Sequence, residues 1–312
     1  MANDNRLTQI SLFIVASIFI LGAFAIVKTA MSASSTVSVT STVEVGNAAP
    51  TVSNISINGG SDIVLTPNAT TSVSVSFTVQ DSNGCNDVFF NGFVTSTAYR
   101  VGVGGACSAD NLNCYTVTTT THNCTANAST SNATATFGIY YFADSTDGAS
   151  SSYPSDVWEG YVAVSDAANS TDTGTSTASV EVGVLTAIDV TTSSINYGTV
   201  SAGTDTGSTN EVATTTNVGN SSTTLRLHAV STLASGSNSI ATSSQEYATS
   251  SFAFGAGVDL TDSVTTVGGF LLTSPTSTAS YAQPTFWGLE VPGGTATGTY
   301  TGTTRFTSFW QP

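Results

Sequence analysis

The stretch VSVSFTV at residues Val73–Val79 decides the fold class of this chain. Apolar residues occupy every second position, which is the pattern of a strand with one buried face. Similar strand-like stretches recur along the sequence, and Gly, Asn, Asp and Pro residues typical of turns separate them. They include residues 88–94, 133–142, 160–164, 176–185, 194–197, 211–216, 224–230, 252–254, 270–272, 286–291 and 299–307. No amphipathic helix pattern follows Lys28, so the sequence predicts an all-β fold.

The strands are expected to form two Ig-like antiparallel β-sandwich domains, preceded by one N-terminal hydrophobic helix. The length of 312 residues suits two domains, because a domain typically has about 150 residues. We expect a disulfide-bearing sandwich at residues 51–185 and an Ig-like sandwich at residues 186–312. The hydrophobic helix is expected within residues 1–33, and a strand and linker at residues 34–50.

The charge composition excludes more functions than it suggests. The chain has five Lys and Arg residues against 20 Asp and Glu, and its formal net charge is −15. Charged residues nevertheless make up only 8% of the chain. With so few cations to neutralise phosphates, the composition argues against binding of nucleic acid and against attraction to anionic lipid headgroups.

The N-terminus indicates export. Residues Ile10–Val27 read ISLFIVASIFILGAFAIV, an uncharged run long enough to cross a bilayer. Cleavage in the small residues 31–35 and retention as an anchor both stay open. In either case the rest of the chain is expected to be extracellular or at the cell surface, with membrane contact only through this helix.

The cysteines also indicate an exported protein. Cys85, Cys107, Cys114 and Cys124 form an even set, and the sequence has no CxxC pair. Two disulfides are therefore expected rather than a zinc site, since oxidising compartments let disulfides persist. Three pairings are possible, and the sequence does not choose among them.

Acidic residues form two groups on predicted loops. Asp81, Asn83 and Asp87 form the first group, and Asp144 and Asp147 belong to the second. Oxygen ligands on loops between strands suit Ca²⁺, although neither group has EF-hand spacing. Turn capping by Asp and Asn side chains explains the same residues without an ion. Calcium is the one cofactor that the sequence suggests.

Residues Ser34–Gly46 read SSTVSVTSTVEVG and are a candidate assembly strand. Val37, Val39, Val43 and Val45 fall on one face of an extended chain. The end of this stretch resembles residues 176–183, STASVEVG, which are expected to close the first domain. An unpaired strand of this kind can add to the sheet edge of another chain. The alternative is that it simply opens the first domain.

No catalytic constellation is evident. The chain has two histidines, His122 and His228, and neither belongs to an HExxH or GxSxG motif. His228 is in phase with Arg226 and opposite Leu225 and Leu227, which predicts a solvent-facing position. We therefore expect no enzymatic activity.

Adjacent aromatic residues stand in two places, at Phe89, Phe90 and Phe93 and at residues 140–142. Core packing on one face of a strand explains them, because aromatic side chains bury large areas. The alternatives are a carbohydrate-stacking platform or a subunit interface.

Several motifs carry a resemblance. They are Ile195–Val200 with Gly203, Thr216–Asn220, Leu289–Pro292 and Gly298–Gly302 in the second domain, and GCNDV and YFADSTD in the first. With these motifs the chain resembles uncharacterised exported, Ser/Thr-rich surface proteins of candidate-phylum bacteria that carry Ig-like sandwich modules. The resemblance implies a role at the cell surface and supplies no catalytic or binding residue.

The sequence therefore predicts a non-catalytic, extracellular structural or adhesive protein whose partners are cell-surface components or identical subunits. One alternative is a pilin-like subunit that assembles through its N-terminal helix and a donated strand. Against it, no glutamate stands near the start of the apolar run. Another alternative is a surface module that binds calcium or carbohydrate.

Overall fold

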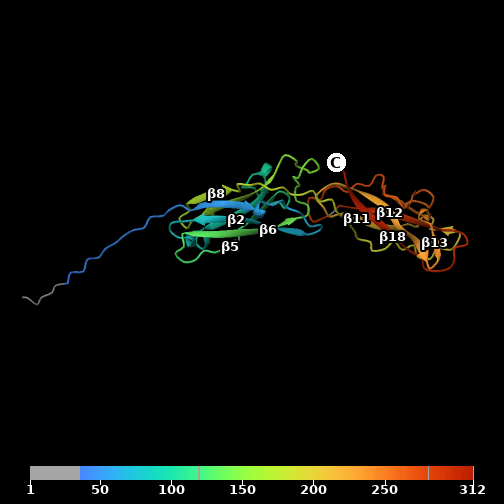
Figure 1. Ribbon diagram of the computed structural model, residues 1–312, viewed down its shortest axis with the longest axis horizontal. Coiled ribbons are helices and arrows are strands. Elements are labelled where there is room, and N and C mark those ends of the chain that lie inside the picture. The colour runs from blue at the N-terminus through green and yellow to red at the C-terminus, as the bar shows by residue number, and fades with distance from the viewer. Residues whose placement is uncertain (1–35, 119, 280, 312) are drawn as a thin grey trace, which may run out of the picture. The chain divides into compact units, whose positions relative to one another are not determined.

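The computed structural model describes residues 36–118, 120–279 and 281–311 (Figure 1). Residues 47–312 form one compact unit, and residues 36–46 belong to a separate one. The predicted hydrophobic helix lies outside the described residues. Within the described part of the chain, no helix is both long and apolar enough to cross a membrane.

The all-β prediction is confirmed. Helical structure in the described residues is limited to the short helix α2 (Cys85–Phe89) and the 3-10 turns η1 (Asn58–Gly60), η2 (Val101–Val103) and η3 (Thr242–Ser244). The chain is rich in Thr and Val, whose β-branched side chains fit a pleated surface better than a helix.

Eight strands lie between residues 51 and 175. They are β1 (Thr51–Ile57), β2 (Thr70–Gln80), β3 (Phe93–Arg100), β4 (Cys114–Val117), β5 (Thr121–His122), β6 (Thr130–Tyr140), β7 (Trp158–Ser165) and β8 (Thr171–Thr175). They form two antiparallel sheets, with strand orders β1-β2-β6-β5 and β4-β3-β7-β8.

These two sheets face each other across one core. Val75 of β2 and Val162 of β7 are fully buried in the same apolar cluster. The sheets approach so closely at Gly160 that an added Cβ would lie 3.0 Å from the Val75 side chain. Trp158 is also fully buried, and its indole N–H donates a hydrogen bond to the carbonyl of Asp144 at 3.0 Å. The first half of the unit is thus a sandwich around one tryptophan.

Ten strands lie between residues 188 and 310. They are β9 (Ile188–Val190), β10 (Thr204–Asp205), β11 (Glu211–Asn217), β12 (Thr223–Ser235), β13 (Asn238–Ile240), β14 (Gln245–Ala248), β15 (Val258–Asp259), β16 (Thr265–Thr266), β17 (Ala282–Val291) and β18 (Thr301–Trp310). One sheet has the order β15-β14-β17-β11-β9, with β10 beside β17. In the other, β12 pairs with β13, β16 and β18.

The second half repeats the packing of the first. Trp287 of β17 is fully buried beside Tyr247, and Leu225 and Leu227 of β12 close the same cluster from the other sheet. His228 lies on the opposite face of β12 from these two leucines, as the alternation predicts, but it is half-buried and its Nδ1 is not exposed to solvent. The assignment of both halves as Ig-like domains, with a boundary at residue 185, stays a prediction.

The predicted strand at residues 88–94 is wrong. Residues 85–89 form helix α2 instead, and β3 begins only at Phe93. A close backbone contact separates the two elements, because a Cβ on Gly92 would lie 2.0 Å from the carbonyl oxygen of Ser165. The chain therefore turns at Gly92, where the backbone of Ser165 lies against it, and the apolar residues before this point belong to the helix and not to a strand.

Other predicted strands also fail where a pairing partner is missing. No strand forms within residues 36–46, 194–197 or 252–254. Residues 176–183 contribute only isolated bridges, in which Val180 pairs with Trp158 and Val182 with Ile63. Period-two alternation specifies a face for a strand, but a ladder also needs a neighbour with the matching register.

Both predicted disulfides are present. One joins Cys85 to Cys124, which are 39 residues apart, and the other joins Cys107 to Cys114, which are 7 apart. Disulfides of this kind indicate an oxidising compartment.

The longer disulfide is expected to stabilise the fold more than the shorter one. A disulfide lowers the conformational entropy of the unfolded chain. Closing a loop of 39 residues raises the free energy of the unfolded state by about 4 kcal/mol, and closing one of 7 residues raises it by about 2 kcal/mol. Replacing Cys85 and Cys124 by serine should therefore lower the free energy of unfolding more than the same change at Cys107 and Cys114. Urea denaturation of the two double variants measures this order, and the reverse order would contradict it.

Candidate metal centre

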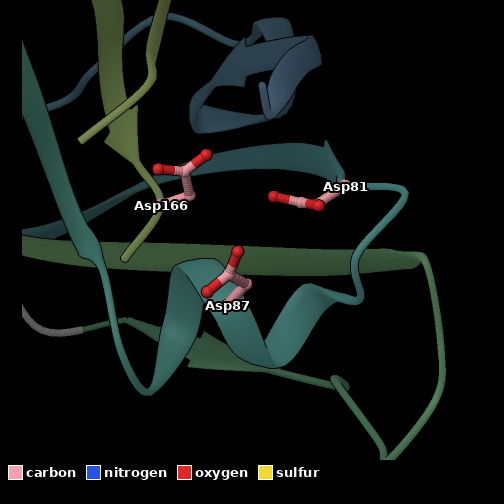
Figure 2. A group of neighbouring side chains, drawn as sticks. All are labelled: Asp81, Asp87 and Asp166. Atoms are coloured by element: carbon pink, nitrogen blue, oxygen red, sulfur yellow. The ribbon is translucent and has the colours of Figure 1, made fainter. Parts of the chain in front are cut away.

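Three carboxylates meet at one end of the first sandwich. Asp81 follows β2, Asp87 lies on α2, and Asp166 follows β7. One oxygen from each side chain lies within 4.8 Å of the others. Figure 2 shows the three carboxylates pointing toward a common space. We call these residues the aspartate triad.

Asp81 has one carboxylate oxygen in use and one without a partner. Its Oδ1 accepts the backbone N–H of Asn83 at 2.7 Å, which is the turn capping that the sequence suggested. Its Oδ2 accepts no hydrogen bond, and water does not reach it, because the residue is only 1% exposed. A buried charged oxygen without a partner is costly, so this atom is suited to bind a cation.

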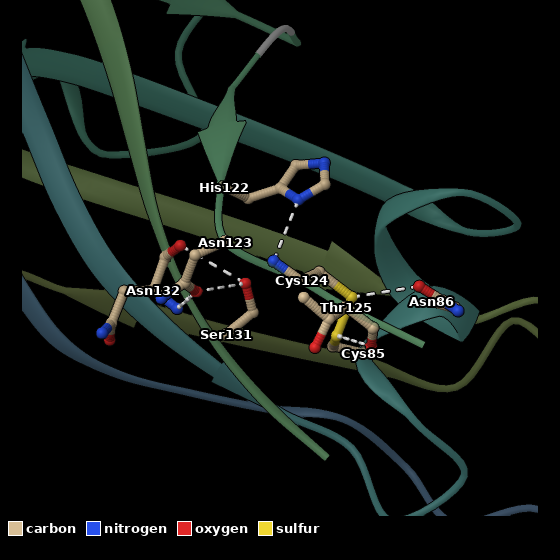
Figure 3. The surroundings of a disulfide bond; sticks show 8 residues. All are labelled: Cys85, Asn86, His122, Asn123, Cys124, Thr125, Ser131 and Asn132. Atoms are coloured by element: carbon tan, nitrogen blue, oxygen red, sulfur yellow. Dashed lines mark hydrogen bonds between the residues drawn. A yellow bond between two sulfur atoms is a disulfide. The ribbon is translucent and has the colours of Figure 1, made fainter. Parts of the chain in front are cut away.

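Asp87 is positioned by a turn and a disulfide. Gly84 has a φ of 113°, a conformation that favours glycine, and its N–H donates to the carbonyl of Asp81. Cys85 then begins α2, with its N–H bonded to the carbonyl of Ala128 and its sulfur joined to Cys124 (Figure 3). The helix that carries Asp87 is therefore fixed to the neighbouring loop.

Asp166 connects the triad to the segment that leads into β1. Its Oδ1 accepts the N–H of Ser170, and its Oδ2 accepts the side-chain amide of Asn47, both at 2.8 Å. The hydrogen bond from Asn47 lowers the pKa of Asp166. The N–H of Ala48 donates to Oδ1 of Asn83 at 2.7 Å. The loop after β2, the loop after β7 and residues 47–48 are thus held together around the triad.

The electrostatics of the triad favour a cation. Burial raises the pKa of Asp81, and the negative charges of Asp87 and Asp166 raise it further, while the N–H of Asn83 acts in the opposite direction. No basic residue pairs with the triad, because the ion pairs of the described residues all involve Arg100. Three neighbouring carboxylates without a counter-charge suit a divalent cation.

The ligand chemistry favours calcium. Ca²⁺ binds oxygen at 2.3–2.6 Å, so two of its ligands lie at most about 5 Å apart. The spacing within the triad, up to 4.8 Å, is compatible with three oxygens around one ion. All three ligands are hard carboxylate oxygens, whereas zinc favours Cys and His. Water would complete the six to eight ligands that Ca²⁺ takes.

The structure brings together part of the predicted calcium set. Asp81 and Asp87 belong to the triad, and Asn83 shapes its turn and binds Ala48. Asp144 and Asp147 lie outside the triad. Oδ1 of Asp147 accepts the N–H of Val184 at 2.7 Å.

Asp144 takes part in a buried ion cluster. Its Oδ2 accepts hydrogen bonds from Nε of Arg100 at 3.0 Å and from the side-chain amide of Asn113. Asp156 binds the same guanidinium group, which lies 3.6 Å above the ring centroid of Tyr153. Burial raises the pKa of Asp144, and the charge of Arg100 opposes this effect. The cluster uses its carboxylates to neutralise an arginine, so a metal is not needed there.

Asp166 was missed from the sequence because its neighbours in the triad lie far away along the chain. Pairing of Phe93 with Ser165 in the β3–β7 ladder places the residue after β7 beside the segment before β3. Its position two residues after the predicted strand 160–164 was the available signal, but the sequence does not show which strand pairs with which.

The aromatic residues divide between packing and exposure. Tyr141 and Phe142 are buried, as the packing interpretation expects. Phe89 stacks on the His122 ring with centroids 4.3 Å apart. Phe90 and Phe93 are 66% and 53% exposed. The alternating pattern of a strand does not apply here, since Phe89 ends α2 and Phe93 begins β3.

Comparisons with known proteins give no family. No protein-family model matches the chain, and no curated protein matches it in sequence. Among solved structures, a match is found to the secreted serine protease VesC from Vibrio cholerae, with 10% identity and a TM-score of 0.19. It covers 80% of this chain and 49% of that one, so the chain spans about half the length of the protease. At this TM-score the likeness supports no statement about fold or activity.

Removing the carboxylate of Asp144 should strongly destabilise the protein. In Asp144→Ala the guanidinium of Arg100, which is 9% exposed, keeps Asp156 but loses its more buried partner. A loss of about 3 kcal/mol in the free energy of unfolding is expected. Urea denaturation measures it, with Asp262→Asn as a control at an exposed carboxylate. Equal stability of the two variants would contradict this role for Asp144.

Neutralising Asp81 should stabilise the calcium-free protein. In Asp81→Asn the buried oxygen no longer carries charge beside Asp87 and Asp166, so the free energy of unfolding at pH 7 should rise by about 1–2 kcal/mol. Because the pKa of Asp81 is raised in the folded state, this advantage should shrink as acid protonates the native carboxylate. Denaturation with a chelator present, at pH 7 and at low pH, measures both effects. If the variant is less stable than the wild type at pH 7, the carboxylate of Asp81 is not destabilised by Asp87 and Asp166.

Proposed function

We propose that this protein is an extracellular structural or adhesive component without catalytic activity, and that its first sandwich binds one Ca²⁺ ion through the aspartate triad. The observation that carries the calcium site is the buried, unpartnered Oδ2 of Asp81, which faces two further carboxylates. Export is supported by the two disulfides and by the apolar run at residues 10–27.

Calcium would tie together separate segments of the sandwich. The triad draws on the end of β2, on α2 and on the loop after β7, and Asn47 and Ala48 attach to the same group of residues. A bound ion replaces mutual repulsion among these carboxylates by attraction to a common charge. The structural consequence is a stiffer end of the sandwich where the chain enters β1. Extracellular modules bind calcium in the range of about 0.1–1 mM, which suits such a role.

The histidines support a non-catalytic role. His122 is stacked against Phe89, and its Nδ1 accepts the backbone N–H of Cys124 at 3.3 Å (Figure 3). Within the described residues, neither His122 nor His228 forms an ion pair with a carboxylate. A general base needs a group that orients its ring, as in a Ser-His-Asp arrangement.

Thermal unfolding at increasing calcium concentration tests the site. A ligand that binds only the native state stabilises it by RT ln(1 + [L]/Kd), so 10 mM Ca²⁺ should add about 1.4–2.7 kcal/mol for a Kd of about 0.1–1 mM. The melting temperature should rise by several degrees. Asp81→Asn and Asp166→Asn should remove this rise, and Asp262→Asn should keep it. A rise that is equal in all variants, or no rise at all, would overturn the calcium site.

Carbohydrate binding is a second candidate, favoured by the exposure of Phe90 and Phe93. These rings are the most exposed phenylalanines of the described chain. Phe93 lines a cavity of about 280 Å³ together with His122, and the Phe90 ring contacts His122 with centroids 5.4 Å apart. Exposed aromatic faces can stack on the apolar faces of sugars. Binding to a glycan array that Phe90→Ala abolishes would support this role, and an array without a signal would reject it.

A further inference from the structure

The C-terminal strand β18 presents a long unpaired edge. β18 pairs with β12 and with no other strand in the described part of the chain (Figure 1). It has ten residues, compared with seven in the edge strand β1 and five in β8. None of its ten residues is fully buried. Proteins usually keep exposed edges short or cover them, because the free N–H and C=O groups pair readily with another strand.

The two faces of β18 differ. Phe306 faces the core and contacts Trp287 with ring centroids 5.8 Å apart, and the Ser308 hydroxyl donates to the carbonyl of Thr186. Arg305 lies on the outer face together with Phe309, whose ring lies 3.4 Å from the guanidinium carbon of Arg226. Phe306 remains half-exposed although it belongs to the core face. The core is thus incompletely covered along this edge.

Residues 36–45 have the complementary pattern. Val37, Val39, Val43 and Val45 are between 78% and 88% exposed, and all four lie on one face of an extended chain. This segment forms no ladder within the described residues. As a strand, residues 36–45 would run for about 34 Å, enough to lie along the ten residues of β18. Four exposed valines on one face are an unusual apolar surface that another sheet edge would bury.

The charges also match. Glu44 is the one charged residue of the segment, and it lies on the face opposite the valines. Arg305 is the one charged residue of β18, and it forms no ion pair within the described residues. If the valines turn toward the core beside Phe306, Glu44 turns outward, to the same side as Arg305. Opposite charges on neighbouring strands favour pairing.

We infer that residues 36–45 of one copy add as a strand to the free edge of β18 in a second copy, with the valines against the Phe306 side and Glu44 near Arg305. Because the donor segment and the acceptor strand are different parts of the chain, each copy can donate and accept at once. Such a heterologous contact generates rings or open filaments. The inference uses no residue of the aspartate triad, so it stands or fails independently of the calcium site.

Charge reversal at the two positions tests the contact. Sedimentation velocity of the full chain in detergent micelles, with electron microscopy of the same samples, is expected to show oligomers larger than a dimer. Glu44→Arg and Arg305→Glu should each shift at least half of the oligomers to monomers, and the double variant should restore them. Asp262→Arg, a charge reversal at an exposed loop position, should leave assembly unchanged. A monomeric wild-type chain, or a double variant that does not recover, would overturn the inference.

A mixing experiment tests the head-to-tail direction. A chain with Val39→Asp and Val43→Asp cannot donate but keeps its β18 edge, and its sandwiches are untouched because both residues precede residue 47. A chain with Arg305→Glu keeps the donor segment. Each chain alone should be mainly monomeric. A 1:1 mixture should form dimers, in which the donor segment of the Arg305→Glu chain pairs with the intact β18 edge of the other chain. Nothing longer should form, because that other chain has no working donor segment. Dimers without longer species support the inference. Filaments formed by the Val39→Asp, Val43→Asp chain alone would overturn it, since they would need no donor strand.

Discussion

The antiparallel ladder between β2 and β6 runs without interruption from the pair Thr70–Tyr140 to the pair Gln80–Thr130. A slip of one residue would turn every inward side chain of β2 toward solvent, so this register is strongly specified. It places Val73, Val75 and the following alternate residues in the core. It also ends at Gln80, which leaves Asp81 as the first residue beyond the ladder. The same constraint therefore sets the core and the position of the most buried carboxylate of the triad.

Two further strand pairings, β1 with β2 and β3 with β7, bring the other residues of the site to the end of this ladder. Pairing of Thr51 with Gln80 brings the entry to β1 beside the exit of β2, where Asn47 and Ala48 meet Asp166 and Asn83. Pairing of Phe93 with Ser165 brings the exit of β7 beside the segment that contains α2. Asp81 and Asp166 are thus positioned by strand ends, and Asp87 by the short helix beside them. The proposed cation site would therefore be largely preorganised.

These registers also explain what could be predicted from the sequence. Strands such as β2 and β6 were predictable, because alternation is a local property that the core then reinforces. Asp81 and Asp87 were predictable as a pair because they are close along the chain, but Asp166 required knowledge of strand pairing. The strand predicted at residues 88–94 overlaps the end of α2. Its apolar residues suggested a strand, but the Gly84 turn and the Cys85–Cys124 disulfide, which the local pattern does not reveal, fix a helix there. Asp144 resembled a ligand until its partner, Arg100, was known.

The scarcity of positive charge connects the remaining features. After Lys28 the chain has three basic residues, Arg100, Arg226 and Arg305. Arg100 neutralises Asp144 and Asp156 inside the first sandwich, and Arg226 lies over the Phe309 ring in the second. No arginine or lysine of the described residues pairs with the triad, so a cation from solution is the natural group to neutralise its charge. Arg305 is left without an acid in its own described chain, and Glu44 without a base. In a protein with so few cations, each unpaired charge limits the chemistry of the partner that can neutralise it. This is why we propose a metal ion for the aspartate triad and a second copy for Glu44 and Arg305.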